Sequence, residues 1–332
     1  MESSVEKEIK IQKVKRIFEK QLCKQLQLLK VSSPLMVLEH EGLNDDLNGV
    51  ERPVKFPIKA LNDEKAVVVH SLAKWKRLKL ADYNFPINQG IVTDMKALRP
   101  DEDYSPIHSI YVDQWDWEKV IHKEDRSLDY LKSTVKSIFK AFKQTEKKLI
   151  KQGIIESVLL PEKIKFIHSE KLLQLYPNLS AKEREHRITE KYGAVFIIGI
   201  GHPLSSGFAH DGRAADYDDW STKTEKGFGL NGDLIVWSPK LGHSLELSSM
   251  GIRVDAKALE KQLKLKGEEK KVQLPYHSQL LQGKLPHTIG GGIGQSRVCM
   301  FFLQKQHIGE VQSSIWPQEQ LKSMKEKGLQ IL

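Results

Sequence analysis

The spacing of apolar residues along the chain predicts three long helices. The first thirty residues predict an amphipathic helix that ends before Pro34, because the residue before a proline is forced into extended geometry. A second helix is expected from about Ser127 to Gln152, where Gly153 ends it. A third opens with the capping box at 180–183 and ends near Gly193. The apolar positions of the first helix are Val5, Ile9, Val14, Ile17, Phe18, Leu22, Leu26 and Leu29.

Short runs that are rich in β-branched residues, or that alternate strictly, predict strands. Pro34 opens one such strand, and Ser71 is expected to cap a short helix that follows another. Alternation in the run 109–117 places Gln114 and Asp116 on one face and the two tryptophans, Trp115 and Trp117, on the other. The remaining strands are expected at residues 65–70, 91–98, 194–200, 233–237 and 245–254.

The order of these elements indicates the fold class. Strands outnumber the helices that could connect parallel strands, and no internal repeat or linker divides the chain. We therefore expect residues 1–332 to form a single catalytic domain of the α/β (α+β) class, with a mainly antiparallel sheet flanked by helices.

Composition and charge narrow the class of protein. Of the 332 residues, 39% are hydrophobic and 29% are charged, and the formal net charge of +9 favours anionic partners such as nucleotides without requiring a nucleic acid. Cys23 and Cys299 could close at most one disulfide, which indicates a reducing compartment. No signal-peptide pattern opens the chain, and the longest uncharged run, near 193–201, is about half of the roughly 20 residues that a membrane span needs. We expect a cytoplasmic protein.

A glycine-rich run before a predicted helix at 298–303 is the strongest local signal. The run 290–297 reads Gly-Gly-Gly-Ile-Gly-Gln-Ser-Arg and matches neither a P-loop nor the dinucleotide-binding fingerprint. Glycines such as Gly292 and Gly294 would let a flat ring lie against the backbone, and Arg297 offers planar donors to a phosphate. A tight turn between strand and helix explains the run equally well.

Two further groups of residues suggest a nucleotide site. Arg99 and the acids after it, Glu102 among them, could clamp the α-phosphate of ATP, although a solvated hairpin tip is the commoner explanation of such a sequence. Asp233 and Glu246, on adjacent predicted strands, could share a Mg²⁺ that is bound to ATP. Exposed strand carboxylates are an alternative of equal weight.

In this order the signals resemble the three motifs of class II aminoacyl-tRNA synthetases. Motif one is the helix followed by Pro34 (about 5–40), motif two is Arg99 with an acid two residues on (about 91–118), and motif three is the glycine run that ends in Arg297 (about 288–303). That family binds ATP on an antiparallel sheet and activates a carboxylate as an acyl-adenylate. The segments 233–236 and 246–253 are similar to the metal and amino-acid segments of its aspartyl and asparaginyl branch.

Nearly the whole chain, about residues 5–320, resembles a narrower family, the ammonia-dependent asparagine synthetases. This resemblance implies a homodimer that converts L-aspartate, ATP and ammonia into L-asparagine, AMP and pyrophosphate through a β-aspartyl-adenylate, with Mg²⁺ bound to ATP. The similar blocks lie at residues 70–77, 95–103, 111–118, 215–222, 230–233, 246–255 and 288–297.

The resemblance also implies roles for individual residues. Arg99 and Arg297 would bind the α- and γ-phosphate sides of ATP, and Asp116 would take the proton that ammonium must lose before attack. ATP contacts are expected from Arg99, Glu102, Gly292, Gly294 and Arg297, and Mg²⁺ ligands from Asp233 and Glu246. Aspartate contacts are expected from Asp45, Ser71, Lys76, Gln114, Asp116, Asp216, Ser249 and Arg253, with Asp45 at the α-ammonium, Lys76 and Arg253 at the α-carboxylate, and Gln114, Asp116 and Asp216 around the reacting end.

Several of these residues have a plainer explanation. Asp211, Asp218 and Asp219 are interpreted as turn acids that solvate a loop, and the two tryptophans as core or subunit contacts. Asp46 stands beside Asp45 and competes with it for the same role. The twelve histidines show no metal-binding spacing.

Two other functions compete with the ligase. One is transfer of aspartate to tRNA or another small acceptor, although the small positive charge and the absence of a recognisable anticodon-binding module argue against nucleic acid as a partner. The other is a sensor that binds ligand without catalysis. Because the chain begins Met1-Glu2 and so has no N-terminal cysteine nucleophile, free ammonia rather than glutamine is the expected nitrogen donor.

Overall fold

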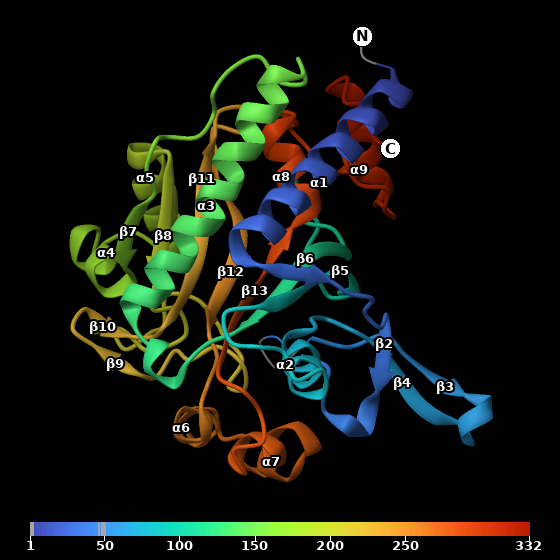
Figure 1. Ribbon diagram of the computed structural model, residues 1–332. Coiled ribbons are helices and arrows are strands. Elements are labelled where there is room, and N and C mark those ends of the chain that lie inside the picture. The colour runs from blue at the N-terminus through green and yellow to red at the C-terminus, as the bar shows by residue number, and fades with distance from the viewer. Residues whose placement is uncertain (1–2, 46, 48–50) are drawn as a thin grey trace.

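The computed structural model describes residues 3–45, 47 and 51–332, and its centre is an eight-stranded sheet (Figure 1). Only the two edge pairings, β1 with β5 and β7 with β8, are parallel, and every pairing between them is antiparallel. The predicted mainly antiparallel sheet is therefore confirmed. In spatial order the strands are β1 (Leu28–Lys30), β5 (Gly90–Leu98), β6 (Tyr111–Val120), β13 (Thr288–Gly294), β12 (His243–Ile252), β11 (Asn231–Ser238), β8 (Ala194–Ile198) and β7 (Lys165–His168).

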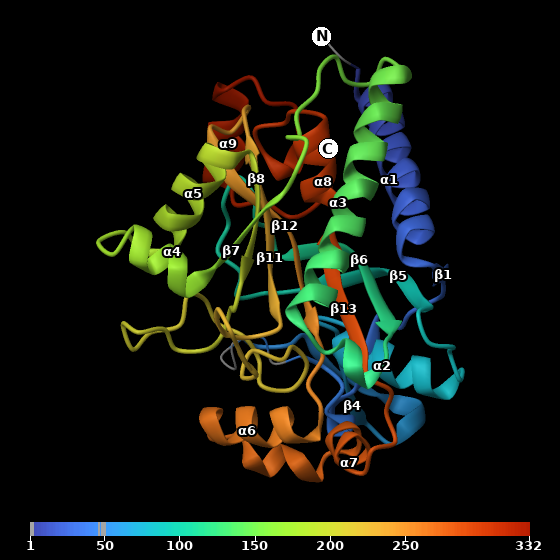
Figure 2. The ribbon, with the colours of Figure 1, turned by 60° about the vertical axis from the view of Figure 1, so that its left-hand side comes forward.

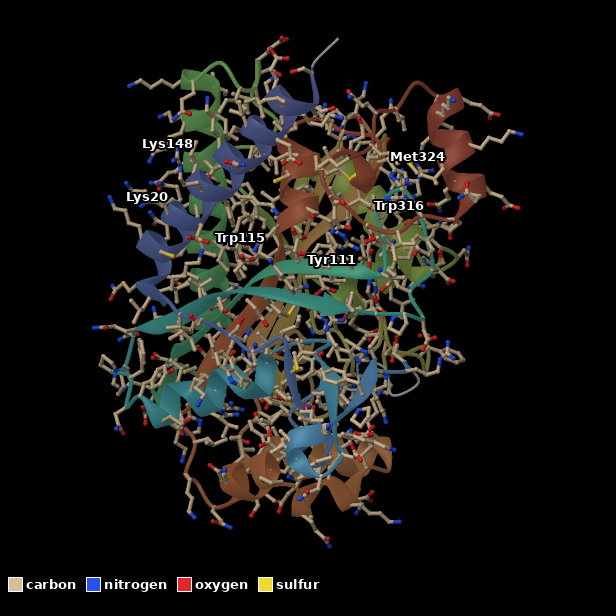
Figure 3. The ribbon with its side chains drawn as sticks, turned by 90° about the vertical axis from the view of Figure 1, so that its right-hand side faces the viewer. Lys20, Tyr111, Trp115, Lys148, Trp316 and Met324 are labelled. Carbon is tan, nitrogen blue, oxygen red and sulfur yellow. The ribbon has the colours of Figure 1, made fainter. Side chains whose placement is uncertain are left out.

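Three helices pack together over one face of the sheet: α1 (Ser4–Leu26), α3 (Leu128–Lys151) and α8 (Gln295–Phe302). α1 and α3 lie side by side (Figures 1 and 2). On this face lies Trp115 of β6, which is labelled in Figure 3. Its ring centroid is 4.7 Å from that of Phe18 of α1, within the largest apolar cluster. The assignment of Trp115 and Trp117 to the core is confirmed, since both are buried in that cluster.

The remaining elements border this centre. α2 (Ala73–Asp82) contacts β5, β6 and β13, while α5 (Ala181–Tyr192) packs on β8, β11 and β12. A small sheet in the order β2 (Met36–Leu38), β4 (Glu64–Val68), β3 (Lys55–Ile58) projects beside α2 (Figure 1). The others are α4 (Ser169–Leu175), α6 (Ala256–Lys266), α7 (Pro275–Leu281), α9 (Gln318–Glu326), the ribbon of β9 (Lys223–Thr224) and β10 (Gly227–Phe228), and 3₁₀ turns at Glu39–Glu41, Lys59–Leu61, Lys123–Asp125, Glu269–Gln273 and Ile308–Glu310.

Most predicted helix boundaries are confirmed by their caps. Ser127 accepts a hydrogen bond from the Tyr130 amide at the start of α3, and the capping box at 180–183 opens α5. Two predictions were wrong. α1 ends at Leu26, because Leu29 belongs to β1 and pairs with the sheet edge, and Leu72 rather than Ser71 is the N-cap of α2.

The glycine run is a strand and not the tight turn that was its alternative explanation. Residues Thr288–Gly294 form β13 between β6 and β12, and α8 begins directly after it at Gln295, earlier than predicted. Side chains of β6 cross this strand closely. A Cβ at Gly290 would lie 1.9 Å from Glu118 Oε2, and one at Gly292 would lie 2.1 Å from Gln114 Oε1. Within the part of the chain that the structure describes, no helix combines the length and the apolarity that crossing a bilayer requires.

Candidate active site

A cavity of about 400 Å³ opens over β6, β12 and β13, and it collects most of the residues that the sequence singled out. Arg99 and Arg297, which are far apart in the sequence, both line it. The structure therefore brings these two predicted residues to the same cavity. The predicted site residues on its wall are Asp45, Ser71, Arg99, Glu102, Gln114, Asp116, Glu246, Ser249, Arg253, Gly292, Gly294 and Arg297.

Each of the two arginines is anchored to backbone carbonyl groups. Arg99 follows β5, and its Nη2 donates to the carbonyl oxygen of His70 at 3.3 Å. Arg297, in the first turn of α8, donates from Nη1 to the Glu246 carbonyl oxygen at 3.1 Å. Within the described residues, the buried Nε of Arg99 has no hydrogen-bond partner. Both guanidinium groups keep donors that could serve a phosphate.

Three cationic side chains, Arg99, Lys182 and Arg297, line the cavity together with the carboxylates of Glu102, Asp211 and Glu246. His108 lies on the same wall, and burial together with the charges of Arg297, Lys182 and Arg99 lowers the pKa of the His108 imidazole to about 4. His108 is therefore neutral at pH 7 and contributes no positive charge to the cavity. The guanidinium groups among these side chains offer planar donors to a phosphate.

Asp45 and Ser71 form a second polar corner of the cavity. Ser71 Oγ donates to Asp45 Oδ2 at 2.9 Å, and the Leu47 amide donates to Asp45 Oδ1 at 2.9 Å. Burial, with Asp216 nearby, raises the pKa of the Asp45 carboxyl. Neutralising that carboxylate with a cationic ligand would be favourable. The competing residue, Asp46, lies outside the described residues.

The structure does not bring Lys76 to the cavity wall, although the sequence placed it at the substrate. Lys76 is fully buried on α2, where its Nζ pairs with Asp116 and donates to the Trp117 carbonyl oxygen at 3.0 Å. Glu118 Oε2 lies 3.9 Å from the same Nζ. Burial lowers the pKa of the Lys76 ammonium, against the pull of these two carboxylates. Lys76 is thus the counter-charge of Asp116, which does line the cavity.

Arg253 presents a guanidinium that two buried carboxylates hold in place. Its Nη2 lies 2.7 Å from Glu118 Oε2, its Nε donates to Glu118 Oε1 at 3.0 Å, and its Nη1 pairs with Asp218. The interpretation of Asp218 and Asp219 as solvated turn acids was wrong. Both are buried, and Asp219 Oδ2 accepts from Arg126 at 2.6 Å.

Asp216 also lies away from the cavity wall. Its Oδ2 is 3.0 Å from Lys74 Nζ and 3.0 Å from His277 Nε2, and all three side chains are buried. Burial alone would raise the pKa of the Asp216 carboxyl, but these two partners hold it below its usual range. The expected direct contact with substrate is replaced by an interior ion pair beneath Asp45.

The two carboxylates predicted to bind Mg²⁺ occupy different environments. Asp233 and Glu246 stand on the paired strands β11 and β12, as predicted, but only Glu246 lines the cavity. Asp233 pairs with Arg213, whose Nη2 also donates to Ser249 Oγ at 2.9 Å. Burial, and the nearby charge of Glu246, raise the pKa of Asp233 to about 7 in spite of Arg213.

Some residues around the cavity were missed by the sequence analysis. Glu118 follows Gln114 and Asp116 at a spacing of two on β6, and that alternation could have placed it on the same face. Asp113 on the cavity wall accepts from the Ser296 amide at 3.0 Å and pairs with Lys15 of α1 at 2.8 Å. The two contacts of Asp113 and the ion pair of Arg213 join residues far apart in the chain, so the spacing of residues in the sequence could not have predicted them.

Comparison with known proteins identifies relatives along almost the entire chain. The family model described as aspartate–ammonia ligase matches residues 5–328. The aspartate–ammonia ligase of Parabacteroides distasonis is 55% identical over 326 residues, which covers 98% of this chain and 94% of the relative. That of Clostridium tetani is 55% identical over 324 residues, with 98% and 93% covered.

Solved structures show the same fold at much lower identity. Asparaginyl-tRNA synthetase from Pyrococcus horikoshii, in a complex with asparaginyl-adenylate, superposes with a TM-score of 0.70 at 14% identity, over 94% of this chain and 70% of that one. Aspartyl-tRNA synthetase from Entamoeba histolytica gives a TM-score of 0.60 at 14% identity, over 92% and 58%. The fold is thus that of a class II synthetase catalytic domain.

Proposed function

The chain belongs to the aspartate–ammonia ligase family, and from that premise we propose that it joins ammonia to the side-chain carboxylate of L-aspartate, converting ATP to AMP and pyrophosphate. The product is L-asparagine, so the enzyme serves asparagine biosynthesis. The observation that carries the proposal is the meeting of Arg99 and Arg297 in one cavity with Asp45, Asp116 and Arg253.

The first step is activation of an unreactive carboxylate. A β-carboxylate oxygen of aspartate attacks the α-phosphorus of ATP, and pyrophosphate leaves with the electrons of the bond that breaks. Arg99 would stabilise the charge on the α-phosphate and Arg297 the charge on the γ-phosphate side. Gly292, Gly294 and Glu102 line the same cavity and would border the nucleotide.

Aspartate must be held with its β-carboxylate toward ATP. Arg253, fixed by Glu118 and Asp218, is the candidate for the α-carboxylate. Asp45 is the candidate for the α-ammonium, because burial raises the pKa of its carboxyl and a cation beside it would offset that cost. Lys76 and Asp216 then act from behind the wall, Lys76 on Asp116 and Asp216 on Asp45. Ser71, Gln114 and Ser249 complete the contacts proposed for aspartate.

The second step needs neutral ammonia at the activated carbonyl carbon. Ammonium must lose one proton before attack, and after attack AMP leaves and a second proton is released. Asp116 is the candidate acceptor, since it lines the cavity beside Gln114 on β6. Its pairing with Lys76 of α2 holds the carboxylate in place at the cavity wall.

A magnesium ion is implied by the use of ATP, and the residues fit it in part. No group of three or more His, Cys, Asp or Glu side chains that could hold a metal occurs among the described residues. An ion that arrives with the phosphates of ATP needs only one or two protein carboxylates. Glu246 on the cavity wall would hold the ion. Asp233 could bind it only by giving up its ion pair with Arg213. Bound Mg²⁺ would neutralise phosphate charge.

We further propose a cytoplasmic homodimer in which each chain is one catalytic domain. The support for a dimer is apolar exposure along α1 and β1, where Val5, Ile9 and Leu29 are 69%, 46% and 58% exposed. The support for a reducing compartment is that Cys23 and Cys299 are free thiols. Sedimentation of the purified chain tests the dimer directly.

The test of function is a complete reaction with purified protein. Aspartate, Mg-ATP and ammonium should yield equimolar asparagine, AMP and pyrophosphate, while glutamine should not replace ammonium. Arg99→Ala should lower aspartate-dependent exchange of pyrophosphate into ATP by about a hundredfold or more, because it removes a donor from the α-phosphate. The far-ultraviolet circular dichroism should stay native.

A matched control is Arg52→Ala, which removes an exposed arginine that pairs with Asp101 near the same loop. Its exchange rate should equal that of the wild type. Formation of ADP in place of AMP, or asparagine formed only from glutamine, would overturn the proposal.

A further inference from the structure

A third cation reaches the cavity from an element outside the three motifs. Lys182 stands in the first turn of α5, and its side chain lines the cavity together with Arg99 and Arg297. Its Nζ lies 3.3 Å from Asp211 Oδ2 and 3.2 Å from Glu185 Oε2. The Lys182 side chain is 66% exposed, so these two carboxylates hold the ammonium at the mouth of the cavity without burying it.

A shared neighbour, Glu246, places Lys182 on the Arg297 side of the site. The Glu246 carboxylate lies 3.9 Å from Arg297 Nη1 and helps to raise the pKa of the Lys182 ammonium. Lys182 therefore remains charged at every physiological pH. Lys182, Arg297 and Arg99 line the same cavity as His108, and the charges of all three oppose protonation of its imidazole.

Stability alone does not account for a lysine at this position. An exposed ion pair between residues three apart on a helix contributes little to folding. Glu185 is itself buried and has a second partner, His210 Nε2 at 3.1 Å. Asp211 lies in the loop before Arg213 and forms a second ion pair with Lys182 from outside the helix. These contacts hold Lys182 on the wall of the cavity that Arg297 also lines.

We propose that Lys182 binds the β- and γ-phosphates of ATP, and the departing pyrophosphate, beside Arg297. The inference rests on the proposed function and deepens it by adding a residue from α5. When the β-carboxylate oxygen attacks the α-phosphorus, the bond from that phosphorus to the bridging oxygen breaks, and this oxygen keeps the electron pair. Lys182 and Arg297 neutralise the charge that develops on pyrophosphate.

Ligands that differ only in their phosphates provide the test. AMP, Mg-ATP and inorganic pyrophosphate are titrated into wild type, Lys182→Gln and Lys182→Arg, with Lys191→Gln at the other end of α5 as the matched control. Lys182→Gln should weaken the binding of Mg-ATP and pyrophosphate by about tenfold and leave AMP unchanged, because AMP lacks the outer phosphates. Lys182→Arg should recover most of the loss, and Lys191→Gln should match the wild type.

Unchanged binding of Mg-ATP and pyrophosphate by Lys182→Gln would overturn the inference. Equal weakening of AMP would overturn it too, because that pattern indicates a structural role for the side chain. If the wild type itself binds neither AMP nor Mg-ATP, the proposed function fails. A wild type that binds both, with Lys182→Gln indistinguishable from it, refutes only the role of Lys182.

Discussion

At the scale of single residues, the site is built from charges whose partners lie behind the cavity wall. Asp116 and Arg253 face the cavity, while Lys76 and Glu118 compensate them from the interior. Burying such charges is costly unless each has a partner with good geometry. The partners therefore fix where the functional groups point.

Removing one member of such a pair should cost stability as well as activity. Asp116→Asn removes the carboxylate nearest the buried Lys76 ammonium and leaves the more distant Glu118 at 3.9 Å. It should lower the free energy of unfolding by about 3 kcal/mol. Adding Lys76→Met should restore at least half of that loss, because no unpaired charge remains. Urea denaturation of the wild type, both single variants and the double variant measures the coupling.

Asp82→Asn is the control, since it breaks an exposed pair with Lys79 on the same helix and should cost less than about 1 kcal/mol. A double variant as unstable as Asp116→Asn would contradict the pair argument. Where the double variant folds but forms no asparagine, the Asp116–Lys76 pair acts in the chemistry and not only in folding.

At the scale of elements, β13 lets two functional strands approach each other across it. Its glycines leave room for side chains of β6, so Glu118 can reach Arg253, which directly follows β12. This packing is enough to explain the glycines, whether or not a nucleotide also contacts the strand. The glycines are required by the neighbours of the strand, and none of Gly290, Gly292 and Gly294 has a positive φ.

Alanine substitutions along β13 should separate these positions. Gly290→Ala places a Cβ 1.9 Å from Glu118 Oε2 and should lower the free energy of unfolding by about 2–3 kcal/mol, because the buried pair with Arg253 must shift. Gly294→Ala finds its nearest atom at 3.5 Å and should cost less than about 1 kcal/mol. Thermal and urea unfolding compare the two.

Gly292→Ala is the informative intermediate. Its Cβ would meet Gln114 Oε1, the end of a flexible side chain on the cavity wall. This variant should fold normally but bind substrate poorly. Equal stability of the Gly290 and Gly294 variants would show that packing against Glu118 does not explain the run.

At the scale of the whole molecule, buried charges join segments that are far apart in the chain. Asp216, in the long loop after β8, meets Lys74 of α2 and His277 of α7. Asp113 on β6 similarly joins Lys15 of α1 to Ser296 at the start of α8, next to Arg297. The position of Arg297 therefore depends on three elements at once.

The Asp216 ion pair predicts acid sensitivity. Its partners hold the pKa of Asp216 below its unfolded value, so its contribution to stability is complete above about pH 4 and is lost as pH falls toward the folded pKa. Between pH 5 and 3 the wild type should lose free energy of unfolding more steeply than Asp216→Asn. Urea midpoints at several pH values measure both slopes, and parallel curves would contradict the argument.

Much of this protein was determined by local sequence. The helix caps, the alternation in β6 and the excess of strands over crossover helices predicted the sheet class and most boundaries, because those signals act between residues close in the chain. The order of the three motifs indicated that Arg99 and Arg297 belong to one site. Their family resemblance supplied the substrate, which spacing and periodicity leave open.

Tertiary structure alone decided which charged residues face the cavity and which lie behind it. Lys76, Asp216 and Asp233 are as polar in sequence as Arg253 or Glu246, yet their ion-pair partners hold them away from the wall. Lys182 resembles any solvated helix residue until α5 is packed beside β11 and β12. The reason is that a charged side chain takes its role from the desolvation and partners that folding imposes, and these depend on residues far away in the chain.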